Sequence, residues 1–330
     1  MARFLHDQNK VVLLHESGTY ATASGSGVWV GQVQTHSIDD EEGKIENRFL
    51  GTQTRSYDGL DQGPRDVTGT LEMHPQDMRL MFWAIGSNVD TSGATYSHIS
   101  TQLNTDARQS AFTSGPLNPP ISFTLEDSKQ SPGTGRNFNR TVNGCVLNTI
   151  SLTATQGEKV MLSADYIGQT LSVGSGATTS VTEVTGTPYL WSSASLNIAG
   201  SDISTTKEVS IEINNNLEAP HYLNGSRDIA TPFPGNRENT LSVTLDWDGN
   251  DSDFLYNDLY KDNTQFNATL DLNQDVTATG SKHAIFFLSG CRMLKPDVPS
   301  ANEGPTEVTF DIMAEKVIGS SFDTTAYNPF

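Results

Sequence analysis

Alternating apolar and polar positions dominate the chain and predict a mainly β protein. Val209, Ile211 and Ile213 are separated by single polar residues, which is the pattern of a strand with one face in water. The same alternation predicts strands at Val28 and Val30, Val67 to Met73, Ile121 to Leu125, Val142 to Leu152, Val160 to Tyr166, Leu196 and Ile198, Leu241 to Trp247, Phe266 to Leu272, and Val308 to Ala314. Ala284 to Leu288 form an apolar run.

Helical spacing of apolar residues is limited to two short stretches. One is 75–85, where Pro75 can open a helix and Gly86 can close it. The other lies near 252–260. We expect each helix to lie against a sheet, with the neighbouring aromatic side chains in the core: Phe82, Trp83, Trp247 and Phe254.

The predicted elements occur twice in the same order. Residues 63–73 precede the first helix and residues 235–245 precede the second, and each is followed later by a strand entered through Gly-Cys, at Gly144-Cys145 and Gly290-Cys291. The sequence therefore predicts two tandem copies of one β-rich unit.

The spacing of these landmarks locates an insertion in the first copy. Arg65 and Arg237 are 172 residues apart, but Cys145 and Cys291 are only 146 apart. The first copy therefore holds roughly 26 additional residues. We assign them to the polar stretch 87–119, expected to be a long surface loop because loop backbone can be hydrated.

Composition and spacing predict four parts: an irregular N-terminal arm, 1–26; a first domain, 27–171; a linker, 172–188; and a second domain, 189–330. The acidic run Asp39 to Glu42 with Gly43 separates a strand near Val30 from another near 45–50. It is expected to form the tip of a long, solvated hairpin.

The charge balance argues against nucleic-acid binding. The chain has a formal net charge of −19 over 330 residues and a pI near 4.6, so a basic surface for phosphates is absent as a bulk property. Hydrophobic residues make up 35% of the chain, which is low for one large core. No stretch reaches membrane-spanning length and no apolar signal core follows Met1, so we expect synthesis in a cytoplasm and no membrane association.

Candidate chemistry is weak. Both cysteines are expected to be buried thiols, and no C-x-x-C pattern suggests zinc. The acidic stretch Asp246, Asp248, Asn250 and Asp251 resembles a calcium loop, but Gly and Glu are missing from the EF-hand positions. The alternative is a turn whose acids cap the following helix. No phosphate loop, helical histidine pair or nucleophile elbow is present, so neither an enzyme nor a cofactor is expected.

Three stretches resemble tail tube proteins of long-tailed bacterial and archaeal viruses. The first is Leu14 to Thr22, followed by Val30-Gly31-Gln32-Val33. The second is Asp66 to Leu71 followed by Pro75 and a helix ending Ala84-Ile85-Gly86. The third is Ser210 to Leu217, leading to Arg237 and the next strand. Together they span most of the chain.

This resemblance implies two tandem β-sandwich or partly closed barrel domains, each with one flanking helix and a long hairpin lining a lumen. Subunits of this family form rings that stack into a tube through which viral DNA passes without sequence-specific binding. A two-domain chain is similar to members that form trimers with pseudo-sixfold symmetry. The implied location is the virion tail, assembled in the host cytoplasm with tape measure and other tail proteins. The implied lumen hairpins are 33–55 and 207–226, with these acids: Asp39, Asp40, Glu41, Glu42, Glu46 and Glu212.

Two alternatives remain open at the level of sequence. A distal tail or tail-terminator protein would form a single ring from the same fold, and a carbohydrate-binding adhesin would need an aromatic platform. For a tube subunit, the expected contacts between rings are the N-terminal arm, the 87–119 loop and Ala326 to Phe330.

Overall fold

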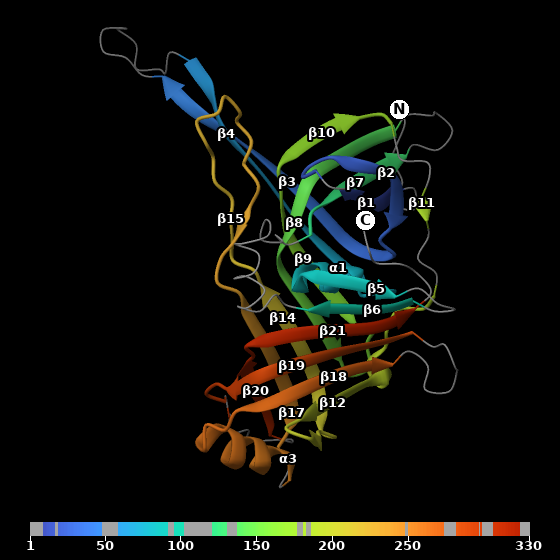
Figure 1. Cartoon of the computed structure of the whole chain (residues 1–330), viewed down its shortest axis with the longest axis vertical. Helices are drawn as coiled ribbons and strands as arrows, with labels where there is room; N and C mark the ends of the chain where they lie inside the picture. The colour runs from blue at the N-terminus through green and yellow to red at the C-terminus, as the bar shows by residue number, and fades with distance from the viewer. Residues whose placement is uncertain are drawn as a thin grey trace.

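The computed structural model of the chain is built mainly of antiparallel strands, as predicted (Figure 1). It describes residues 9–16, 19–47, 59–91, 96–101, 121–130, 137–176, 181–182, 186–247, 250–273, 282–296, 298 and 306–323. Among these residues, no helix combines the length and apolar character needed to cross a bilayer.

The strands are β1 Asn9–Glu16, β2 Ala23–Trp29, β3 Gln32–Asn47, β4 Gly59–His74, β5 Ser87–Thr91, β6 Tyr96–Thr101, β7 Phe123–Gln130, β8 Asn137–Thr155, β9 Met161–Gly168, β10 Thr170–Gly174, β11 Val181–Thr182, β12 Ala194–Ile198, β13 Ser201–Asp202, β14 Thr206–Asn214, β15 Leu217–Glu218, β16 Phe233–Pro234, β17 Glu238–Asp246, β18 Phe266–Asn273, β19 His283–Met293, β20 Glu307–Met313 and β21 Lys316–Asp323. The helices are α1 Arg79–Ile85, the short turn η2 Trp191–Ser193, α3 Asp251–Asp253 and the π-helical segment η3 Phe254–Lys261.

Three connected sheets account for all of these strands except the small β15–β16 pair. Sheet A has the order β11–β2–β1–β7–β8–β10. Sheet B has the order β3–β4–β9–β8–β14–β17–β20–β19. Sheet C has the order β5–β6–β21–β19–β18–β12–β13. Because β8 belongs to sheets A and B, and β19 to sheets C and B, each of these strands joins two layers.

The Gly-Cys pairs mark the points where β8 and β19 change sheet. Gly144 and Gly290 have φ of 69° and 68°, a conformation that glycine adopts without steric cost. The register of β7 against β8 shifts at Cys145, and that of β18 against β19 shifts at Cys291. Each site is therefore a β-bulge that bends a strand from one sheet into the next. The sequence located these landmarks correctly, but they lie inside the strands and not at their starts.

Most of the apolar positions that the alternation predicted are buried in the core, but Trp247, which was also expected there, is 38% exposed. In sheet B the buried side chains recur at every second residue of β14, β17 and β20: Val209, Ile211, Ile213, Leu241, Val243, Leu245, Val308, Phe310 and Ile312. Burial of such a side chain stabilises the fold by about 1.5–3 kcal/mol. Since the intervening residues are polar, one face of sheet B packs on the core and the other meets solvent.

Helix α1 is shorter than predicted and is buried along its whole length. The helix begins at Arg79. The Pro75 carbonyl does not form a helical hydrogen bond, because it accepts one from Tyr189 N (3.2 Å), in the segment before β12. At its other end the Gly86 N–H donates to the Phe82 carbonyl (3.1 Å), as a helix-ending glycine is expected to do. The second predicted helix is confirmed as α3 and η3.

Hydrogen bonds to the end of α1 connect the two halves of the chain. Arg237, just before β17, donates to the carbonyls of Ala84 (3.0 Å) and Ile85 (2.6 Å). Its Nε also donates to Asn215 (2.8 Å), whose amide reaches the Leu147 carbonyl (2.9 Å). These contacts satisfy helix-end carbonyls and support the adjacent β8–β14 pairing.

The predicted irregular arm over 1–26 is wrong for most of its described part. Residues 9–16 form β1, which pairs with both β2 and β7, and β2 begins at Ala23. Val11 to Leu14 are all buried because β1 lies inside sheet A with apolar side chains on both faces. Period two does not reveal such a strand. Residues 1–8 lie outside the described residues.

The predicted loop over 87–119 is also partly wrong. Residues 87–91 and 96–101 form the hairpin β5–β6, and β6 adds to the edge of β21 in sheet C. Residues 102–119 lie outside the described residues. The predicted linker, 172–188, likewise begins inside β10, and Val181–Thr182 form β11 beside β2. Short polar strands of this kind form because they pair with neighbouring strands, and their own sequence pattern does not predict them.

Candidate assembly surface

The exposed face of sheet B is an extended polar surface that crosses seven strands. Its side chains alternate with the core residues along every strand, and none of them is fully buried. They are Thr35, Ser37, Asp39 and Glu41 of β3; Asp66, Thr68, Thr70 and Glu72 of β4; Met161, Ser163, Asp165 and Ile167 of β9; Thr149, Ser151, Thr153 and Thr155 of β8; Glu208, Ser210, Glu212 and Asn214 of β14; Glu238, Thr240, Ser242, Thr244 and Asp246 of β17; and Glu307, Thr309, Asp311 and Met313 of β20.

Acidic and hydroxyl side chains dominate this face, which we call the acidic face. Hydroxyls are used in cross-strand pairs such as Ser242 to Asp311 (2.7 Å) and Thr153 to Ser210 (3.0 Å). Lys207, at the bulge of β14, reaches this face, and its Nζ contacts Asp246 (2.7 Å) and Glu307 (2.6 Å). Hydrogen bonds to these two carboxylates raise the pKa of Lys207.

Like charges lie close together on the acidic face. The pKa of Asp165 is raised, first by partial burial and then by the neighbouring carboxylate of Glu72. A nearby negative charge disfavours ionisation of a carboxyl group in this way. The face therefore presents a negative potential, which repels a polyanion.

Three of the six predicted lumen acids lie on the acidic face: Asp39, Glu41 and Glu212. Asp40 and Glu42 lie on the opposite side of β3, beside Val67 and Arg65, and Glu46 is exposed in the outer part of the hairpin. The other acids of this face were not predicted, although each occupies a polar position of an alternating strand. They could have been found from the rule that every second residue of a strand lies on the same face of the sheet.

The predicted acidic hairpin tip is wrong. Asp39 to Glu42 lie inside β3 and pair with residues 65–68 of β4, so the strand continues through them to Asn47. Arg65 compensates for part of this charge: its guanidinium binds both carboxylate oxygens of Asp40, at 2.6 and 2.8 Å. That contact lowers the pKa of Asp40. Residues 48–58, which connect β3 to β4, lie outside the described residues.

The segment 207–226 is not a hairpin of its own, because both antiparallel partners of β14, β8 and β17, lie outside this segment. The chain leaves sheet B at Asn215 and returns at Arg237, forming an extended arm that runs beside the β3–β4 hairpin (Figure 1). Arg65 N donates to the Arg227 carbonyl (2.9 Å), and His221 Nε2 lies 3.0 Å from Asp66 Oδ1. The arm thus contacts β4, the strand that pairs with the first predicted lumen segment, 33–55.

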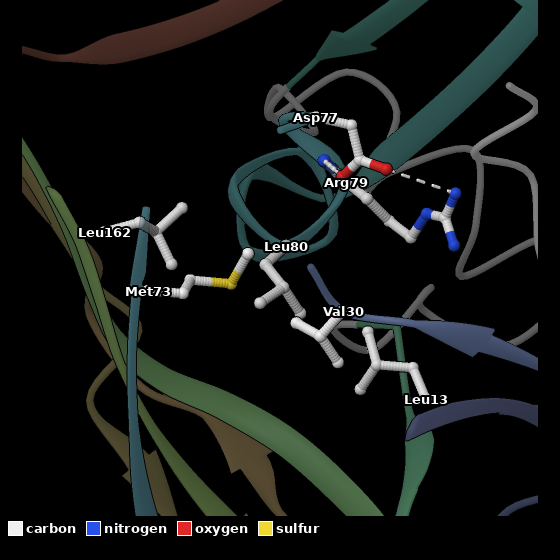
Figure 2. A pocket seen from close by; sticks show the side chains of 7 residues that line it. All are labelled: Leu13, Val30, Met73, Asp77, Arg79, Leu80 and Leu162. Carbon is white, nitrogen blue, oxygen red and sulfur yellow. Dashed lines mark hydrogen bonds and ion pairs between the residues drawn. The ribbon is translucent and has the colours of Figure 1, made fainter. Parts of the chain in front are cut away.

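An enclosed cavity next to α1 is too small for a substrate. Figure 2 shows its lining, in which the ion pair of Asp77 and Arg79 lies above apolar side chains from β1, β4 and β9. Its volume is about 10 Å³, which is roughly the space that one water molecule needs. The cavity is a packing defect beside a buried ion pair.

The residues of the calcium-like stretch have separate partners where they are described. Asp246 pairs with Lys207, and Asp251 accepts hydrogen bonds from Ser204 N (3.0 Å) and Thr205 Oγ1 (3.3 Å). Asn250 precedes α3, and Asp248 lies outside the described residues. In the described part of the chain, no three His, Cys, Asp or Glu side chains are grouped to hold a metal ion.

A known protein family matches nearly the whole chain. Residues 8–314 match the family model described as phage tail tube protein, a range that contains sheets A and B together with both Gly-Cys bends. A search of the curated proteins found no match. The chain belongs to the phage tail tube protein family and is a structural subunit of the virion tail, not an enzyme.

Proposed function

We propose that three copies of this chain close into a ring with pseudo-sixfold symmetry, with the acidic face of sheet B lining the bore. The observation that carries this proposal is that sheet B is continuous through the chain but has an unpaired edge at each end. Among the described residues, β3 pairs only with β4, and Glu307 to Phe310 of β20 pair only with β17. Unpaired strand edges readily pair with another chain, and closure of a ring removes them.

The pseudo-sixfold symmetry rests on two tandem domains with the same order of strand pairings. The first strand set comprises β1–β4 and β7–β10, and the second comprises β12–β14 and β17–β21. In both sets the register shifts at corresponding places: Val33/Thr35 opposite Met73, and Thr206/Glu208 opposite Leu245. Met73 and Leu245 are 172 positions apart, the same offset as Arg65 and Arg237. We therefore propose a first domain of 27–171 extended by β1 and β2, and a second domain within 189–330.

The junction between the two strand sets suggests how neighbouring chains join. Within one chain, Thr149–Thr155 of β8 pair antiparallel with Glu208–Asn214 of β14. The equivalent positions are 295–301, which follow β19, and 35–41 of β3. We propose that Lys295 and Pro296 of one chain lie opposite Glu41 and Asp40 of β3 in the next chain.

A disulfide crosslink tests this junction. In a Glu41→Cys, Lys295→Cys variant, mild oxidation is expected to link chains into a closed covalent trimer that survives non-reducing denaturing electrophoresis. Both positions are exposed, and the native Cys145 and Cys291 are buried, so background crosslinking should be small. The two single variants are the controls. A crosslinked series that continues past the trimer would support a larger ring, and tubes without any crosslink would refute the register.

The bore chemistry fits passage of DNA without binding. Each phosphate contact by Lys or Arg adds affinity, so a wall of acids and hydroxyls leaves few sites where a duplex could be held. We propose that linear viral DNA and the tape measure protein occupy this bore at different stages. The projecting β3–β4 hairpin and the 215–237 arm carry exposed Ile45, Leu60, Tyr222, Leu223 and Phe233, which suit contacts with the adjacent ring.

A further inference from the structure

A buried polar cluster lies between sheets A and B in the first strand set. His36 of β3 and Tyr166 of β9 come from sheet B, and Asp127 of β7 and Arg140 of β8 come from sheet A. His36 Nε2 lies 3.0 Å from Tyr166 Oη, which donates to the Ser37 carbonyl at 3.4 Å. Asp127 forms an ion pair with Arg140, and its carboxylate is 3.9 Å from His36 Nδ1. The His36 and Asp127 side chains are only 5% and 6% exposed.

The second strand set has an apolar cluster at the same place. Strand registers give the equivalent residues as Val209 for His36, Leu270 for Asp127, Phe286 for Arg140 and Ile312 for Tyr166. All four are buried. The same fold can therefore form this contact between the two sheets with apolar side chains alone. The polar groups of the first strand set are not required by the fold.

A neighbouring position differs in a matched way. A Cβ on Gly69 of β4 would overlap Tyr166 Oη and the Ser37 carbonyl, so glycine makes room for the tyrosine hydroxyl. The equivalent residue in β17 is Leu241, which faces the smaller Ile312. Because side-chain size is balanced across the strands in both sets, the polar cluster is an alternative packing solution and not a local defect.

Acidification protonates the His36 imidazole and so adds a positive charge to this cluster. Burial lowers its pKa to about 4, partly opposed by Asp127 and reinforced by the positive charges of Arg140 and Lys129. In an unfolded chain the same group has a pKa near 6.5. Stability due to this site is therefore fully present above about pH 6.5 and is lost as the pH falls towards 4, because the opened state binds the proton more readily.

We propose that this cluster makes the first strand set the acid-sensitive half of the subunit. As the pH falls, the contact between sheets A and B opens in the first strand set, while the apolar contact at the equivalent place in the second strand set stays closed. The two domains would then respond differently to the same acidic environment, although they share a fold.

Hydrogen exchange of the full-length protein tests this inference, with rates corrected for the intrinsic effect of pH. Between pH 7.5 and pH 5, amides of β9 are expected to lose protection by about 30-fold, which is the factor that linkage gives for pKa values of 6.5 and 4. Amides of β20, the equivalent strand, are expected to change little. Equal loss in β9 and β20, or no loss in β9, would overturn the proposal.

Two variants separate His36 from the other titrating groups. His36→Asn is expected to remove most of the pH dependence in β9, whereas His283→Asn, in the second strand set, is expected to retain it. His283 is a matched control because it also lies beside a carboxylate, at 2.7 Å from Asp271. If His36→Asn does not fold, the set H36V, G69L, D127L, R140F and Y166I transplants the apolar solution. Persistent acid sensitivity of β9 in the folded variant would contradict the assignment.

Discussion

Reversing three charges on the acidic face is expected to turn a tube that releases DNA into one that retains it. Asp165, Glu208 and Glu212 lie on the central strands β9 and β14, away from the proposed chain junction. Replacing all three by lysine raises the formal net charge of the chain from −19 to −13. The new cations would contact phosphates in every ring of the tube, so their effect is multiplied along the bore.

The measurement is DNA binding by purified tubes over a range of salt, together with DNA ejection from virions. Wild-type tubes are expected to bind no DNA in the bore. For the variant, the logarithm of the affinity should fall with the logarithm of salt concentration, with a slope of about −0.9 for each phosphate neutralised. Ejection should slow correspondingly at low salt and recover at high salt, because salt screens these contacts.

A matched control changes charge without changing the bore. Asp202, Asp258 and Asp262 are exposed residues outside sheet B, and their replacement by lysine gives the same net charge of −13. This control is expected to eject DNA normally. If it retains DNA as strongly as the bore variant, overall charge and not the acidic face controls passage, and the orientation proposed for sheet B is incorrect.

Gly144→Ala is expected to cause a large loss of stability, because the added methyl group combines backbone strain with overpacking. The residue has a positive φ, and a Cβ there would lie 2.8 Å from the ring of Tyr20. That ring is held in place, since Tyr20 Oη donates to the Gly144 carbonyl (3.0 Å) and the buried Glu16 accepts from Gly144 N (2.7 Å). Backbone strain of about 1–3 kcal/mol adds to an overpacking cost of about 1–3 kcal/mol.

Urea unfolding of two further variants separates the cost of backbone strain from the cost of overpacking against Tyr20. Gly157 has a φ of 86° with no atom within 4 Å of an added Cβ, so Gly157→Ala is expected to show the backbone cost alone. Gly290→Ala would meet the flexible carboxylate of Glu315, which can move, and should fall between the two. Equal stability of the Gly144 and Gly157 variants would mean that the Tyr20 contact does not constrain the bend.

Local patterns were sufficient for the strands that have one wet face. Val209, Ile211 and Ile213 alternate with polar residues because each strand of sheet B packs on the core from one side only. The pattern failed for Val11 to Leu14, where both faces of β1 are covered. It also failed for β5 and β6, whose polar residues become strands through pairing with each other and with β21.

The acidic residues also show what local patterns could and could not predict. The sequence placed Asp39 to Glu42 at a hairpin tip, since four consecutive acids are usually solvated and repel each other. In the structure they lie within β3, with Asp40 held by Arg65 and Asp39 turned to the opposite face. Which acids of a charged run face the same side of a sheet is not determined until the pairing of their strand is known. That pairing depends on residues far away in the chain.

The mainly β fold and the positions of the Gly-Cys bends could be predicted from the amino-acid sequence, because period two and the need for positive φ are properties of neighbouring residues. Family membership followed from the same local motifs. The pairing of β8 with β14, which joins both halves in one sheet, could be seen only in the folded chain. The same holds for the shared face of the acids from separate strands and for the burial of His36 beside Asp127. These arrangements depend on pairing and packing between residues more than a hundred positions apart in some cases, and no local preference specifies them.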